Sequence, residues 1–174
     1  MSEKKRQQLN PQQQSIDSVD DIEGNLQQAI SFYQSSQLPH AEQICQQILR
    51  DFPQHAEALQ LLGIIAYQVG DYRIATSLIT QAIEIDSNQS SFFYNLGNVL
   101  KEQGELKESI KAYQKALKIQ PQFSEAYSNL GMVLKEEGRL VEAVQAYQRA
   151  LEIQPDYVDA YSSIARKRQI KGID

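Results

Sequence analysis

Two asparagines are the side chains in this sequence whose type and spacing point most clearly to a binding chemistry. Asn95 and Asn129 lie 34 residues apart, within the matching stretches FYNLGN and YSNLGM. A side-chain amide carries donors and an acceptor, so each asparagine can pair with one backbone amide of an extended peptide. Amides repeated at that spacing would recognise peptide backbone rather than a particular sequence. The alternative is that each amide bonds to nearby groups of its own chain, as most side-chain hydrogen bonds do.

Residues suited to catalysis are few. The only histidines, His40 and His55, lie in or beside expected turns, and neither belongs to an HExxH motif. The sequence has no CxxC pair and no glycine-rich phosphate-binding loop. Cys45, the single cysteine, falls on the apolar face of an expected helix, and we predict that it is a buried packing residue. The sequence therefore predicts that the protein is not an enzyme and has no catalytic, metal-binding or cofactor-binding residues.

The two asparagines belong to a segment that repeats every 34 residues. Residues 124–157 read SEAYSNLGMVLKEEGRLVEAVQAYQRALEIQPDY, and residues 90–123 read SSFFYNLGNVLKEQGELKESIKAYQKALKIQPQF. Self-similarity at this period is typical of stacked helix pairs. Glycines recur within the first helix of the unit, where they let two helices approach closely, and at its end, where they supply the dihedral angles of a helix exit. The first set is Gly63, Gly97 and Gly131, and the second is Gly70, Gly104 and Gly138.

This pattern resembles the tetratricopeptide repeat family, and the repeats are similar to those of bacterial O-linked N-acetylglucosamine transferase-like proteins. The resemblance covers residues 22–157 and implies an all-α fold, a right-handed solenoid of stacked antiparallel helix pairs. Its four repeats would be 22–55, 56–89, 90–123 and 124–157.

The two ends of the sequence differ from the repeats. Residues 1–21 are polar and glutamine-rich, and we expect them to form a disordered tail. Residues 158–174 continue the apolar columns and end in a cluster of basic residues, so we expect a C-terminal capping helix. The same residues are equally compatible with an array that has been cut before its next helix.

In a solenoid of this family the first helix of each pair lines the concave side. The residues expected there form an N-terminal half that is apolar and aromatic and a C-terminal half that carries amides and lysines. We predict a peptide-binding groove formed by Tyr33, Ile64, Tyr67, Tyr94, Asn95, Asn98, Lys101, Asn129, Met132 and Lys135. We do not expect the carboxylate clamp of chaperone-binding family members, because Tyr94, Asp159 and Ser163 occupy the positions of its cations.

The composition narrows the classes of partner. The formal net charge is −5 and the sequence pI is about 5.1, whereas a nucleic-acid-binding protein needs a basic surface to neutralise phosphates. A single cysteine excludes an intramolecular disulfide and favours a reducing, cytoplasmic compartment. No apolar run is long enough for membrane insertion, and no apolar stretch follows the basic N-terminus as in a secretory signal. We therefore expect a protein or peptide partner, with no nucleic acid.

Two functions are consistent with these observations. The first is a protein–protein interaction scaffold that binds a peptide or partner segment in the concave groove. The alternative is a substrate-recruiting region of a larger or partner enzyme, such as a glycosyltransferase with similar repeats. Weak self-association through the exposed terminal helices is a third hypothesis.

Overall fold

The computed structural model describes residues 19–155, which form eight α-helices and no strand. The helices are α1 (Val19–Gln34), α2 (Leu38–Asp51), α3 (Ala56–Gln68), α4 (Tyr72–Ile85), α5 (Ser90–Glu102), α6 (Leu106–Ile119), α7 (Ser124–Glu136) and α8 (Leu140–Ile153). α1 begins at Val19 rather than at residue 22, where the sequence pattern places its start. The rest of the expected tail and the expected helix over residues 158–174 lie outside the described residues.

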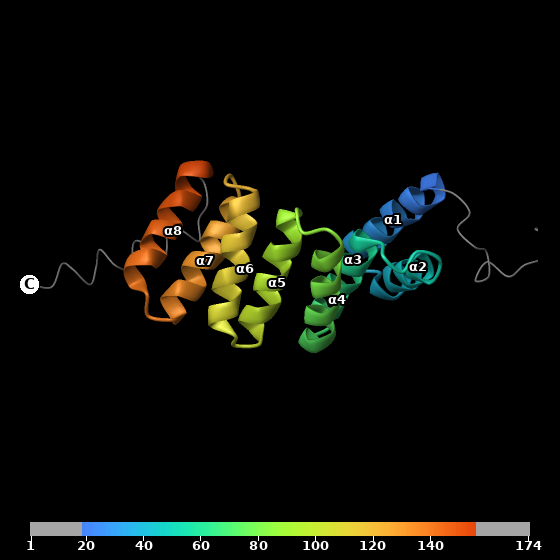
Figure 1. Cartoon of the computed structure of the whole chain (residues 1–174), viewed down its shortest axis with the longest axis horizontal. Helices are drawn as coiled ribbons and strands as arrows, with labels where there is room; N and C mark the ends of the chain where they lie inside the picture. The colour runs from blue at the N-terminus through green and yellow to red at the C-terminus, as the bar shows by residue number, and fades with distance from the viewer. Residues whose placement is uncertain (1–18, 156–174) are drawn as a thin grey trace, which may run out of the picture.

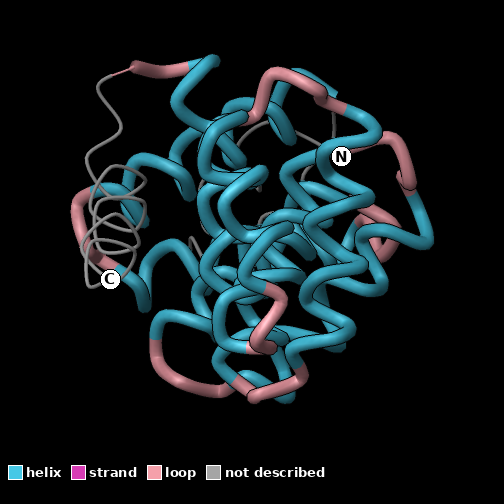
Figure 2. The backbone as a smooth tube through the Cα atoms, turned by 90° about the vertical axis from the view of Figure 1, so that its left-hand side faces the viewer, coloured by secondary structure: helices cyan, strands magenta, loops and turns pink. Residues whose placement is uncertain are grey.

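The helices stack in chain order as antiparallel pairs. α1 packs on α2, α3 on α4, α5 on α6 and α7 on α8, and each second helix also packs on the first helix of the next pair. Figure 1 shows the pairs in a row, with α1 and α2 at one end and α7 and α8 at the other. Viewed from the α8 end, the described chain consists of helices joined by short loops (Figure 2). The expected all-α solenoid of stacked helix pairs is confirmed.

The first helices of successive pairs lie close together. α1 contacts α3, α3 contacts α5 and α5 contacts α7, and within the described helices no two second helices make comparably extensive contact. The array therefore curves toward its first helices, which line the concave side as expected. This curvature places the side chains of four sequence-distant helices along one surface.

In the second, third and fourth repeats, a glycine lies at the end of the first helix. Gly70, Gly104 and Gly138 have φ values of 84°, 77° and 80°. This left-handed region is sterically unfavourable for residues that have a Cβ. The Gly70 N–H donates to the Tyr67 carbonyl at 3.0 Å, and the next N–H donates to the Ala66 carbonyl at 2.9 Å. These two bonds cap the end of the helix. In the first repeat Ser36 takes the same conformation, with a φ of 61°.

The other glycine column allows the close approach of paired helices. A Cβ added at Gly97 would lie 2.6 Å from Cε1 of Tyr113. A Cβ at Gly63 would lie 2.6 Å from Cγ1 of Ile79, and one at Gly131 would lie 2.9 Å from Cδ1 of Tyr147. The three facing side chains are 34 residues apart, so each repeat builds the same contact between its two helices.

Phe92 and Cys45 are both buried. Phe92 is 2% exposed and packs with Ala56, Leu59 and Ala82, so it fills the space between the second and third repeats and does not line the groove. Cys45 is fully buried in the first repeat, which confirms its predicted packing role. Burial, with a smaller contribution from Glu42, raises the pKa of the Cys45 thiol to about 12.

Candidate functional site

The candidate site is the surface formed by the first helices α1, α3, α5 and α7, which we call the concave groove. Its N-terminal part contains a cavity of about 530 Å³ between α1 and α3. A second cavity of about 190 Å³ lies where α1, α3 and α5 meet. Tyr33 and Ile64 line both cavities, so the two cavities adjoin each other.

The smaller cavity brings together half of the predicted groove residues. Its lining includes Tyr33, Ile64, Tyr67, Asn95 and Asn98, which come from three different helices. Apolar side chains of the underlying helices complete the cavity. A partner side chain that enters this cavity would therefore contact aromatic rings and amide groups together.

A hydrogen-bonded cluster continues the groove from α5 to α7. Nδ2 of Asn129 donates to Oδ1 of Asn98 at 2.9 Å and to the Tyr94 hydroxyl at 3.2 Å. The Tyr113 hydroxyl donates to the same Oδ1 of Asn98 at 2.7 Å. The Tyr94 ring also packs against Phe123, with ring centroids 4.8 Å apart. We call Tyr94, Asn98, Tyr113 and Asn129 the groove amide cluster.

The two asparagines of the repeated motif have different environments. Asn129 bonds to groups of its own chain that lie one repeat earlier, whereas the Asn95 side chain forms no hydrogen bond within residues 19–155. The alternative of intrachain bonding therefore describes Asn129 but not Asn95. The partners of Asn129 are groove side chains rather than backbone groups close in sequence.

Sequence reasoning missed the role of Tyr113. It belongs to the column that faces the glycines, and its ring is fully buried. Its hydroxyl nevertheless reaches Asn98 in the groove. Burial, followed by the nearby Tyr94, raises the pKa of the Tyr113 phenol well above its usual range. The available signal was that a buried tyrosine usually needs a partner for its hydroxyl.

The charged and apolar residues predicted for the C-terminal part of the groove lie on α5 and α7. Lys101 is ion-paired with Glu102 at 3.0 Å, which offsets its charge at the surface. Lys135 is exposed on α7, and Met132 is partly buried on the same helix. Two carboxylates that were not predicted, Glu23 and Glu57, border the larger cavity. Within the described residues no hydrogen bond or ion pair joins Lys101, Met132 or Lys135 to the groove amide cluster.

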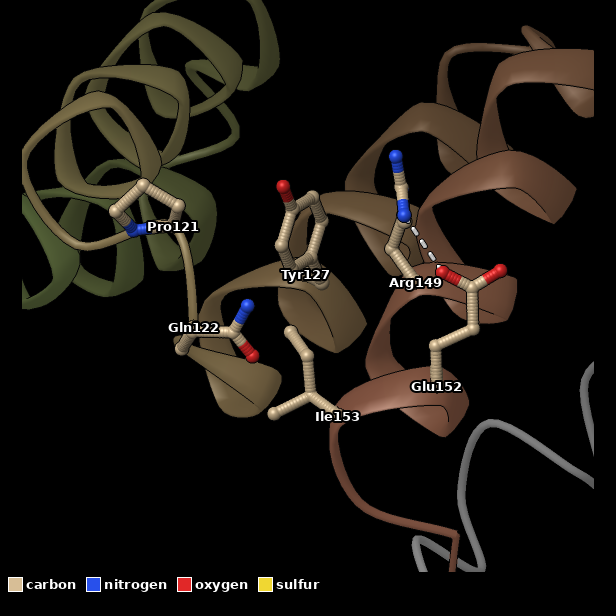
Figure 3. A pocket seen from close by; sticks show the side chains of 6 residues that line it. All are labelled: Pro121, Gln122, Tyr127, Arg149, Glu152 and Ile153. Atoms are coloured by element: carbon tan, nitrogen blue, oxygen red, sulfur yellow. Dashed lines mark hydrogen bonds and ion pairs between the residues drawn. The ribbon is translucent and has the colours of Figure 1, made fainter.

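A further cavity of about 240 Å³ lies between the loop before α7 and the end of α8. Figure 3 shows Tyr127 and Ile153 at its centre and the Arg149–Glu152 ion pair at its edge. The ion pair is 2.7 Å long and both side chains are largely exposed. This cavity contains none of the predicted groove residues.

Two kinds of feature, a cluster of acidic, histidine or cysteine metal ligands and a membrane-spanning helix, are not found among the described residues. No group of three or more His, Cys, Asp or Glu side chains in that part of the chain could hold a metal ion. None of the helices described is both long and apolar enough to cross a bilayer.

Comparisons with known proteins agree with this architecture. Family models described as tetratricopeptide repeat or TPR repeat match residues 26–90, 78–111, 97–138 and 124–157. Among curated proteins, none matches the sequence significantly.

Three solved structures illustrate the similarity of the fold. MamA is 24% identical, with a TM-score of 0.76 over 83% of this chain and 85% of that chain. YrrB, described as a TPR protein with an unusual peptide-binding site, is 18% identical, with a TM-score of 0.71 over 79% of this chain and 71% of that chain. A mutant O-GlcNAc transferase from Thermobaculum terrenum is 30% identical, with a TM-score of 0.67 over 74% of this chain but only 26% of that chain.

The repeat period, the helix pairs, the two glycine columns and four family matches that together span residues 26–157 all lead to one assignment. This chain belongs to the tetratricopeptide repeat family.

Proposed function

We propose that this protein is a non-catalytic interaction scaffold that holds an extended peptide segment of a partner protein in the concave groove. The observation that carries the proposal is the groove amide cluster, because its internal hydrogen bonds fix which polar atoms remain for a ligand. An extended peptide presents alternating N–H and C=O groups, and the cluster offers partners for both.

The orientation of each amide follows from hydrogen-bonding capacity. Oδ1 of Asn98 accepts two hydrogen bonds from within the chain, so the Asn98 amide directs its two N–H donors elsewhere. Nδ2 of Asn129 uses its donors on Asn98 and Tyr94, which leaves Oδ1 of Asn129 as an acceptor. The Tyr94 hydroxyl accepts from Asn129 and keeps its own hydrogen to donate. A ligand on this surface therefore meets a donor, an acceptor and a second donor in fixed positions.

The N-terminal part of the groove supplies apolar anchoring. Tyr33, Ile64 and Tyr67 line cavities that a partner's apolar side chain can fill. Burial, and then the neighbouring Glu102, raises the pKa of the Tyr67 phenol above its ordinary value. Aromatic residues in such pockets are frequent hot spots of binding energy. The similarity to YrrB, whose description mentions a peptide-binding site, supports the same choice of function.

The test is a pull-down from native extract with a triple variant of the groove. Asn95→Ala/Asn129→Ala/Tyr94→Phe removes two amides and one hydroxyl from the groove and keeps the Tyr94 ring packed on Phe123. The matched control is Lys107→Ala/Lys111→Ala/Lys115→Ala, three exposed positions on the second helix α6. We expect the partner to bind wild type and the α6 variant and to be lost from the groove variant. A partner retained by the groove variant and lost from the α6 variant would contradict the proposal.

A second candidate function is the recruitment of substrates for a glycosyltransferase that is attached to or associated with this chain. It is favoured by the 30% identity to part of the T. terrenum O-GlcNAc transferase structure. In that case, partners captured by the groove should carry O-linked N-acetylglucosamine in the native extract. Mass spectrometry of the captured proteins checks this, and unmodified partners would remove the second candidate.

A further inference from the structure

A second concavity lies on the opposite face of α3 from the concave groove. It is a cleft of about 430 Å³ between α2 and α4, and we call it the α2–α4 cleft. α3 contributes Leu61 and Ile64 to the groove cavities but Leu62 and Ala66 to the cleft, which is also lined by Val69, the residue after the end of α3. With 3.6 residues per helical turn, these two sets occupy different sides of α3. The cleft shares no lining residue with either groove cavity.

The cleft is open because this repeat boundary lacks side chains that fill the equivalent space elsewhere. Ala66 stands in the column that holds Leu100 and Leu134 in the next two repeats. Leu134 is 3% exposed at its boundary, so the larger side chain occupies the space there. At the second boundary Thr76 donates to Oε1 of Gln103 at 3.0 Å and ties α4 to α5. The equivalent pair at the first boundary is Glu42 and Val69, which cannot form such a bond.

Two residues at the mouth of the cleft are apolar and exposed, although the equivalent positions of the third repeat hold polar side chains. Val69 is 66% exposed and Ile74 is 43% exposed. The equivalent positions hold Gln103 and Glu108 in the third repeat. Ile74 is the third residue of α4 after the cap Asp71, a position where glutamate is favoured by the capping box and the helix dipole. Exposed apolar side chains at both positions suit a docking surface. A repeat boundary that only faces solvent has no need of them.

The charges at the cleft define the kind of segment that fits it. Its lining contains two carboxylates, Glu42 and Asp71, and no cationic side chain among the described residues. Glu42 accepts from Nε2 of Gln46 at 2.9 Å, and Asp71 accepts from the Ile74 N–H at 3.0 Å, so both carboxylates are held in place at the rim. An apolar floor with an acidic rim is complementary to an apolar side chain that has a cation beside it.

We propose that the α2–α4 cleft is a second docking site, which takes a partner segment with an apolar side chain followed or preceded by lysine or arginine. Its volume falls within the range of sites that enclose small ligands and therefore suits one or two side chains. Because the cleft and the groove lie on opposite faces of α3, one chain can hold two different segments at once. The proposal stands on the cleft alone and does not depend on peptide binding in the groove.

The probe for this site is a displayed library of random peptides, selected against the full wild-type chain. Two variants close the cleft in independent ways. Val69→Gln/Ile74→Glu installs the residues of the next repeat at its mouth, and Ala66→Leu fills its floor with the side chain that later repeats carry. Both variants copy residues that this fold already accommodates at equivalent positions, and helical content and the unfolding midpoint confirm that each is folded. Tyr94→Phe/Asn129→Ala serves as the groove control.

We expect one class of enriched peptides to contain an apolar residue next to lysine or arginine. These peptides should bind both closed variants at least about tenfold more weakly, which corresponds to ~1.4 kcal/mol, and should bind the groove control as they bind wild type. Glu42→Gln should weaken them by a smaller factor because it removes one of the two rim charges. The proposal is overturned if no enriched peptide distinguishes wild type from the closed variants, or if those that do carry no cation.

Discussion

At the scale of single residues, the residue at the glycine position of each first helix and the side chain that faces it on the second helix are matched in size. Gly97 faces Tyr113 and Gly131 faces Tyr147, and a Cβ at either position would lie within 3 Å of the ring. In the first repeat the equivalent residues are Ala29 and Cys45, both fully buried. In the first repeat the methyl group of Ala29 therefore faces the small side chain of Cys45 instead of a tyrosine ring. Helix spacing in the repeat depends on the pair and not on glycine alone.

This matching predicts opposite effects for one substitution at two helical glycines. Gly97→Ala should lower the free energy of unfolding by about 1–3 kcal/mol, because Tyr113 is fully buried and cannot move away. Gly24→Ala should raise it by up to about 1 kcal/mol, because Gly24 is an exposed residue within α1 with open space around it. Urea unfolding of the two variants measures both effects.

A double variant shows whether the contact with Tyr113 is the cause. In the Tyr113→Cys background, which imitates the first repeat, Gly97→Ala should cost little or nothing. An undiminished cost in that background would mean that the helix backbones themselves are too close.

The buried thiol of Cys45 gives a pH-dependent prediction. Its pKa is raised from 9.0 to about 12, so the folded state holds the neutral thiol while the unfolded state ionises near pH 9. This contribution to stability is fully present below pH 9 and is lost as the pH rises toward 12. The stability advantage of wild type over Cys45→Ala should therefore shrink across that interval, as measured by urea unfolding at each pH.

The same burial should protect Cys45 from thiol reagents at neutral pH. Ellman's reagent should label it only after denaturant is added, because the thiolate is the reactive form and the folded site suppresses it. Prompt labelling of the native protein would contradict the burial of this side chain.

At the scale of elements, the four first helices end in the same way, although only three end at glycine. The Ser36 N–H donates to the Tyr33 carbonyl at 3.0 Å and the Gln37 N–H donates to the Phe32 carbonyl at 2.8 Å, as at the later turns. Ser36 adopts a positive φ to do so and is exposed. The first turn thus has the same geometry as the others but a less suitable residue.

Ser36→Gly should stabilise the protein by about 0.5–1 kcal/mol, because glycine adopts a positive φ without the steric penalty of a side chain. The matched control is Gly70→Ser, which places the first-repeat residue at the second turn and should be destabilising. Thermal unfolding of the two variants measures the difference. If Ser36→Gly lowers the midpoint, serine must stabilise this turn through a contact that glycine lacks.

The elements could be predicted from the sequence, but the details of the groove and the cleft could not. Periodicity locates the helix pairs, and Gly70 and Gly97 predict where a helix ends and where two helices approach. The hydroxyl of Tyr113 enters the groove from a column that periodicity assigns to the core. The α2–α4 cleft depends on one missing side chain, Ala66 in place of leucine, and its consequence appears only when neighbouring repeats are packed together.

At the scale of the whole molecule, stacking converts residues that are one repeat apart into neighbours on a single surface. Asn129 reaches Asn98 and Tyr94 across the boundary between the third and fourth repeats. The smaller groove cavity likewise combines side chains from α1, α3 and α5. The binding surface that we propose therefore exists only in the assembled array, and no single repeat contains it.

The most direct test of peptide binding in the concave groove is an NMR titration of the labelled chain with the segment identified by the pull-down. We expect the largest chemical-shift changes on the groove faces of α3, α5 and α7, and we expect the side-chain N–H signals of Asn98 to move downfield as they meet peptide carbonyls. Changes confined to the second helices, with the Asn98 and Tyr67 signals unmoved at saturation, would contradict the account.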